Sequence, residues 1–139
     1  MSYDLYVYRG DIPDDCVSLV CEDESSYESE YETSTYESKY ETSKGRYFNY
    51  TYNLSELFTA FHVNPKRDMD GHTASKVADM IDKALADMPD RNIPMLKQLY
   101  DPPIVDGRQW GSVESALRWL KRIHDYCRKH PDYKVVERS

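Results

Sequence analysis

Hydrophobic and polar residues alternate near the start of the chain, and this spacing predicts strands. Tyr3 to Tyr8 alternate and are rich in tyrosine and valine, as strands are. Gly10 to Asp15 then has the composition of a turn. Two further apolar segments, Cys16 to Cys21 and Tyr47 to Tyr52, are expected to pair as the roots of one long antiparallel hairpin over residues 16 to 53.

Apolar residues take a helical spacing after this hairpin. Asn53 followed by Glu56 is a capping-box arrangement, which predicts that a helix begins here and ends before Pro65. The same spacing predicts three more helices: one from a Thr73 cap to Met88, one from Ile93 to Tyr100, and one from a Ser112 cap to the residue before Pro131.

The segments between these helices complete the prediction. Pro65 to Gly71 is expected to be a polar loop, and Ile104 to Gly111 a loop in which Trp110 is an anchor. Tyr133 to Glu137 is expected to close the sheet as a short final strand. Strands followed by helices and one more strand predict an α+β fold. We expect one domain over residues 1–139, with about four helices on one face of a small antiparallel sheet.

The segment between the hairpin roots contains a tandem repeat. Ser25–Thr33 recurs as Ser34–Thr42, with seven of nine positions identical. The repeat unit has an odd number of residues, and side chains alternate between the two faces of a strand. The tyrosines of both copies therefore share a strand face only if the chain folds back between the copies. Residues whose numbers sum to 69 then pair, which places Asp23 opposite Arg46 and predicts a projecting hairpin arm over residues 22–46. The alternative interpretation is a disordered low-complexity linker.

The arm is the predicted binding surface. Tyrosine supplies rigid amphipathic contact area and serine adapts to a partner, while acidic side chains steer association toward a basic surface. The candidate partner-binding residues are Tyr27, Glu28, Glu30, Tyr31, Tyr36, Glu37, Tyr40 and Glu41.

Charge is divided unevenly along the chain, whose net charge is −7. Residues 1–43 contain twelve acids and two bases, a balance of −10, whereas residues 44–139 contain thirteen acids and sixteen bases, a balance of +3. This asymmetry suggests that two faces meet different partners, or that two copies of the chain attract each other. It disfavours direct nucleic-acid binding by the whole chain.

The cysteines and the apolar segments bear on location. The chain has three cysteines, no secretory leader at its N-terminus and no apolar run near 18 residues. We therefore expect a cytoplasmic protein with reduced thiols and no membrane segment.

Two segments resemble metal sites only in part. His124, Cys127 and His130 follow one another at helical spacing, but the first and last lie about 120° apart around the axis. Asp68 to Gly71 resembles part of a calcium loop, yet Lys66 stands where the first carboxylate ligand belongs. No nucleophile signature or phosphate-binding glycine loop stands out either. The sequence therefore predicts no metal, no cofactor and no enzymatic activity.

Two polar groups have both a structural and a functional interpretation. Asn49 and Thr51 share a strand face and, with Trp110, would line a pocket between the sheet and the helices. The favoured alternative is that Asn49 and Thr51 form hydrogen bonds with backbone groups near the start of the helix. The last helix carries five basic residues that form either a solvated face or a docking strip for an acidic partner: Arg118, Lys121, Arg122, Arg128 and Lys129.

Four elements of the chain carry a resemblance. They are Asn49-Tyr50-Thr51-Tyr52-Asn53-Leu54, Gly71-x-Thr73-Ala74, Gln109-Trp110-Gly111-Ser112 and Cys127-Arg128-Lys129-His130-Pro131. In these elements the chain resembles a family of small uncharacterised proteins of bacteriophages and their bacterial hosts. The resemblance covers the chain except for about residues 22 to 46, where the arm looks like an insertion. It implies a phage or mobile-element setting and no known activity.

Three functional hypotheses follow. The first is a non-catalytic protein-binding protein, such as a phage-encoded inhibitor of a host or defence protein, that acts through the acidic arm in the host cytoplasm. The second is a small-molecule or nucleotide-binding module with the pocket near Asn49, Thr51 and Trp110. The third is an assembly protein that forms homo-oligomers.

Overall fold

The computed structural model describes residues 2–12, 41–42 and 44–139. The tyrosine and glutamate repeat lies almost wholly outside these residues. The hairpin arm and the pairing of its tyrosines therefore stay predictions.

Within the described residues the sheet contains four strands in the order β2-β3-β1-β4, and every neighbouring pair is antiparallel. The central pair is β1 with β3, and it is in register from Ser2 opposite Thr51 to Tyr8 opposite Gly45. The strands are β1 (Ser2–Tyr8), β2 (Glu41–Thr42), β3 (Gly45–Thr51) and β4 (Lys134–Glu137).

The predicted register is wrong at the root of the hairpin. Arg46 of β3 lies between Val7 of β1 and Glu41 of β2, so Asp23 does not lie opposite it. β1 pairs with β3 along its whole length, which the sequence analysis did not predict, and Cys16 to Cys21, the predicted partner, lies outside the described residues. Both segments have an apolar alternation of suitable length, and alternation fixes which face of a strand is buried rather than which strand pairs with it.

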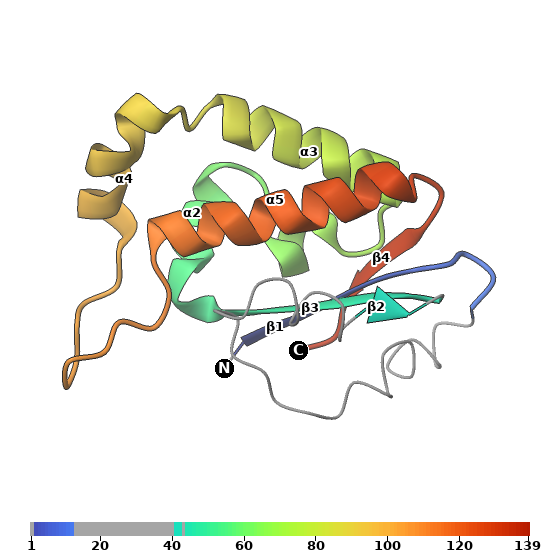
Figure 1. Cartoon of the computed structure of the whole chain (residues 1–139), viewed down its shortest axis with the longest axis horizontal. Helices are drawn as coiled ribbons and strands as arrows, with labels where there is room; N and C mark the ends of the chain where they lie inside the picture. The colour runs from blue at the N-terminus through green and yellow to red at the C-terminus, as the bar shows by residue number, and fades with distance from the viewer. Residues whose placement is uncertain (1, 13–40, 43) are drawn as a thin grey trace.

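Helices cover one face of this sheet, and the α+β class is confirmed. Figure 1 shows α3 and α5 running side by side above the strands, with α4 at one end. The helices are α2 (Ser55–Ala60), α3 (Ala74–Ala86), α4 (Ile93–Tyr100) and α5 (Val113–Lys129), with shorter turns η2 (Tyr52–Leu54), η3 (Pro65–Met69) and η4 (Asp90–Asn92).

Two of the three predicted helix caps are confirmed. The Thr73 hydroxyl accepts a hydrogen bond from the Lys76 amide at 3.3 Å, and Ser112 forms a capping box with Ser115. The third prediction is wrong, because the Asn53 side chain does not cap a helix. Thr51 caps η2 instead and accepts from the Asn53 amide at 3.3 Å.

The segment from Pro65 to Gly71 was expected to be a loop but begins with the helical turn η3. The Asn64 side chain opens this turn by accepting from the amides of Lys66 and Arg67 at 3.0 and 3.2 Å. The turn carries Met69 into the core, where its side chain is fully buried. An asparagine followed by proline is a cap and first-turn pair, so the sequence did contain the signal.

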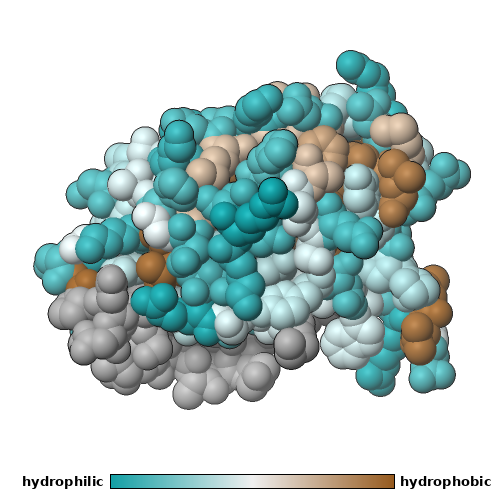
Figure 2. Space-filling model, turned by 180° about the vertical axis from the view of Figure 1, so that it is seen from behind, coloured by the Kyte–Doolittle hydropathy of each residue, from teal (hydrophilic) through white to brown (hydrophobic). Residues whose placement is uncertain are grey.

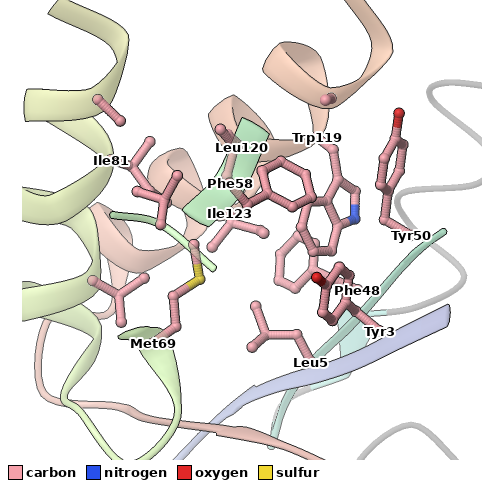
Figure 3. Close-up of a cluster of buried hydrophobic side chains, with 14 of the residues drawn as sticks. Tyr3, Leu5, Phe48, Tyr50, Phe58, Met69, Ile81, Trp119, Leu120 and Ile123 are labelled. Atoms are coloured by element: carbon pink, nitrogen blue, oxygen red, sulfur yellow. The ribbon is translucent and has the colours of Figure 1, made fainter. Parts of the chain in front are cut away.

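An aromatic cluster fills the space between the helices and the sheet (Figure 3). At its centre is Trp119 of α5, whose ring centroid lies 5.3 Å from that of Tyr50 and 5.8 Å from that of Phe58. Trp119 and Tyr126 of this helix are buried, whereas Leu117 is only partly buried. The helix contacts both α3 and the sheet, which requires a wider apolar arc than one stripe.

Candidate protein-binding surface

The exposed hydrophobic side chains are gathered in one part of the chain. Among the residues that the structure describes, all five large hydrophobic side chains that are exposed lie between positions 95 and 110. Single exposed hydrophobic residues are ordinary on protein surfaces, but a group of them marks an interaction site. We call this group the apolar loop surface: Met95 (52% exposed), Leu99 (63%), Ile104 (69%), Val105 (58%) and Trp110 (62%).

The surface has two parts, a helix face and a loop. Met95 and Leu99 are four residues apart and share the outer face of α4, while Leu96 is buried in the core. The loop of residues 101–111 projects beyond the end of α4 in Figure 1. In Figure 2 the hydrophobic colour gathers at this end of the molecule in two groups, one over α4 and one at the tip of the loop.

The tip of the loop is a hydrogen-bonded turn. Val105 and Arg108 exchange two backbone hydrogen bonds, of 2.8 and 3.0 Å. Asp106 and Gly107 between them both have positive φ angles, 52° and 74°, as a type I′ turn requires. Asp-Gly is a preferred sequence for this turn. Ile104 and Val105 are therefore held out on a short hairpin with a defined shape.

Two side-chain hydrogen bonds close the base of the loop. The Asp101 carboxylate accepts from the Val113 amide at 2.7 Å, at the start of α5. The Gln109 side chain donates to the Pro102 carbonyl at 3.0 Å and so joins the two arms of the loop. Both contacts lie within the loop or join it to α5.

A third contact joins the loop to the end of β3. The Asn53 side-chain amide donates to the Trp110 carbonyl at 3.1 Å. The next residue, Gly111, has a φ of 88°, and a Cβ atom there would lie 2.8 Å from Thr51 Cγ2 and 2.9 Å from Leu54 Cδ2. The backbone of Trp110 is thus fixed while its indole is exposed, so the contact surface is ordered before any partner arrives.

The three predicted pocket residues are not brought together. Thr51 and Trp110 are neighbours through Gly111 and Asn53. Asn49, however, lies on the sheet face turned away from the helices, because Phe48 and Tyr50 on either side of it belong to the core. Its side chain donates to Ser2 Oγ and to the Tyr3 carbonyl, both at 3.0 Å. The side chains of Asn49 and Thr51 thus both form hydrogen bonds within the fold.

One of the five basic residues of α5 is engaged in contacts with another helix. Arg128 faces α3, where its guanidinium donates to Asp79 at 2.9 Å and to Asp82. The hydrogen bond from Arg128 holds the pKa of Asp82 below its usual value. Arg128 therefore joins two helices, and only the other four basic residues are left for an exposed strip, in which Arg122 is half-buried.

The three residues with metal-like spacing on α5 also lie in different surroundings. His124 Nε2 lies 2.8 Å from Asp82 Oδ1, whereas the His130 ring stacks on Tyr133 at 4.3 Å. Cys127 is fully buried between them, and burial raises the pKa of its thiol to about 12. In residues 2–12, 41–42 and 44–139, no three potential ligands are grouped to hold a metal ion.

The predicted partner-binding residues of the arm lie outside the described residues, except for Glu41, which pairs with Arg46 in the sheet. The structure adds a surface that the sequence analysis missed. Its signals were the Asp106-Gly107 pair and an α4 sequence with apolar residues on two faces. Within the part of the chain that the structure describes, no helix has the length and apolar character needed to cross a bilayer.

Comparisons of the chain with protein-family models, with curated proteins and with solved structures find no match.

Proposed function

We propose that the chain is a non-catalytic protein-binding module. The observation that carries this proposal is the concentration of exposed hydrophobic side chains on the apolar loop surface. Binding energy at protein interfaces concentrates in a few apolar and aromatic anchors, and tryptophan is prominent among them. The contacts of Asn53, Asp101 and Gln109 hold this loop in shape, which lowers the entropy lost on binding.

The acidic arm is the second part of the proposal. Its composition suits a protein partner with a basic surface, and its tyrosines would anchor that partner. The resemblance to phage proteins implies a phage setting, in which the proposed partner is a host or defence protein and the proposed activity is its inhibition in the host cytoplasm. This activity needs no cofactor and no direct contact with nucleic acid or a membrane.

Pull-down from a bacterial lysate, followed by affinity measurement with the isolated partner, tests the proposal. Three baits are compared with the parent: deletion of residues 25–42, replacement of Tyr27, Tyr31, Tyr36 and Tyr40 by serine, and the loop variant Ile104→Ser/Trp110→Ser. The variant whose changes fall on the contact surface loses clustered anchors, and it should bind the partner more weakly by about 2 kcal/mol or more. The proposal is wrong if the parent captures no protein, or if all three variants bind as the parent does.

The acidic residues of the arm are tested separately. Charge reversal at Glu28, Glu30, Glu37 and Glu41 should mainly slow association and reduce its dependence on salt, because long-range attraction acts on the encounter rate. A change confined to the dissociation rate would show that these acids contact the partner rather than steer it.

A further inference from the structure

We propose that the apolar loop surface binds the same surface of a second copy of this chain, so that the protein forms a two-fold symmetric dimer. This inference rests on the proposed function, because it takes the surface to be a protein-binding one. It goes further by naming the partner of that surface.

The surface has two apolar parts that a two-fold dimer would bring together. Each copy offers a projecting tip, with Ile104 and Val105 beside a tight turn, and a helix face formed by Met95 and Leu99. Figure 2 shows these two apolar groups as separate areas at one end of the molecule, with more polar surface between them. In a two-fold dimer, a residue i that contacts j is matched by a j that contacts i. The tip of each copy can therefore pack on the helix face of the other copy. Both apolar groups are then covered in both copies.

The charges beside the two groups match in the same way. The tip carries Asp106 and Arg108, and the residues that lead into α4 include Asp90 and Arg91. All four side chains are exposed, and none of them forms an ion pair with a described residue. Asp90 and Arg91 lie in η4, the turn that leads directly into α4, so both are near the first turn of the helix that carries Met95. Contact between tip and helix brings Asp106 toward Arg91 and Arg108 toward Asp90.

This charge pattern also favours a second copy over a partner of uniform charge. A strongly basic protein would attract Asp106 and Asp90 but repel Arg108 and Arg91, and an anionic lipid surface would do the reverse. A second copy offers one acid and one base at each contact, as the surface itself does. Apolar patches of this kind cover a few hundred Å², less than the ~800 Å² per partner of a standard complex. Weak, transient complexes belong to this small size class, so we expect a dissociation constant on the order of 10 μM.

Sedimentation velocity of the full chain tests the dimer, over concentrations from about 1 to 500 μM that bracket this dissociation constant. The parent should change from monomer to dimer across this range. The variant Leu99→Ser/Ile104→Ser should stay monomeric with an unchanged circular dichroism spectrum, because both side chains are more than half exposed. The matched control Gln98→Ser, at an exposed position of the same helix, should dimerise as the parent does.

A charge exchange tests the pairing. Asp106→Arg alone should weaken dimerisation about tenfold or more, and adding Arg91→Asp should restore it, because the exchanged pair again has opposite signs. A parent that is monomeric throughout, a dimer unaffected by Leu99→Ser/Ile104→Ser, or an absence of rescue overturns the inference. The inference is also overturned if the dimer is lost on deletion of residues 25–42 but kept in the variant Ile104→Ser/Trp110→Ser. In each case the lysate experiment still decides whether the chain binds another protein, so the two proposals fail separately.

Discussion

The side-chain amide of Asn53 donates a hydrogen bond to the backbone carbonyl of Trp110, with 3.1 Å between nitrogen and oxygen. The two residues are 57 positions apart, so this bond ties the apolar loop surface to the end of β3. Asn53→Ala should lower the free energy of unfolding by about 1 kcal/mol, the usual worth of one such bond. It should also speed hydrogen exchange at the amides of residues 110–112. Asn92→Ala is the control, since the Asn92 side chain caps no helix; equal effects of both variants would contradict the prediction.

A Cβ atom at Gly111 should be poorly tolerated. The residue has a φ of 88°, and an added Cβ would lie 2.8 Å from Thr51 Cγ2 and 2.9 Å from Leu54 Cδ2. Gly111→Ala therefore combines backbone strain with steric overlap and should destabilise the fold by about 2–4 kcal/mol. Gly71→Ala has a similar φ of 85° but nothing within 4 Å of the added atom, so it should cost only the strain, about 1–2 kcal/mol. Denaturant unfolding of both variants measures the difference, and equal losses would show that packing at Gly111 is loose.

The local features of the fold were predictable from the sequence, and the pairing of distant segments was not. Thr73 and Ser112 cap their helices as predicted, because a cap depends on residues three positions away. The pairing of β3 with β1 was not predicted, because β1 and the segment after it have similar alternation. Tertiary contacts decide between two such candidates, and a pattern of apolar positions contains no information about them.

The candidate surface was missed for a related reason. Hydrophobic spacing identifies apolar residues but does not say which of them stay exposed, so Met95 and Leu99 look in the sequence like core residues of α4. Their exposure follows from the position of α4 at one end of the molecule, where Leu96 is buried and Tyr100 packs against the core (Figure 1). The turn at Asp106 and Gly107 was predictable from the dipeptide alone. Its projection from the surface was not, because it depends on how residues 101–111 are anchored.

The Cys127 thiol should be unreactive in the folded chain. The residue is fully buried, and burial raises its pKa to about 12, so the thiolate is scarce at pH 8. Peptide mapping after brief treatment with iodoacetamide at pH 8 should find Cys127 unmodified in native protein and modified in urea. Modification of Cys127 at the same rate in both states would show that α5 opens readily from the core.

Asp82 should make the stability of the fold depend on acid pH. The hydrogen bond from Arg128 is the main cause that lowers the pKa of Asp82 in the folded chain below the ordinary 3.8. A lowered folded pKa means that the stabilising contribution is complete above the unfolded value and is lost as the pH falls through the folded value. Asp82→Asn should therefore lower the free energy of unfolding at pH 7, and its difference from the parent should shrink as the pH falls and the carboxylate of the parent becomes protonated.

The control for this pH dependence is Asp87→Asn. Asp87 lies 3.5 Å from Lys83 on the exposed side of α3, and such a surface pair contributes little to stability. In urea unfolding at pH 7, Asp82→Asn should therefore have a lower free energy of unfolding than Asp87→Asn. At low pH the free energies of unfolding of Asp82→Asn and the parent should converge. If Asp82→Asn falls below the parent by the same amount at every pH, the loss comes from packing between α3 and α5 rather than from the charge on Asp82.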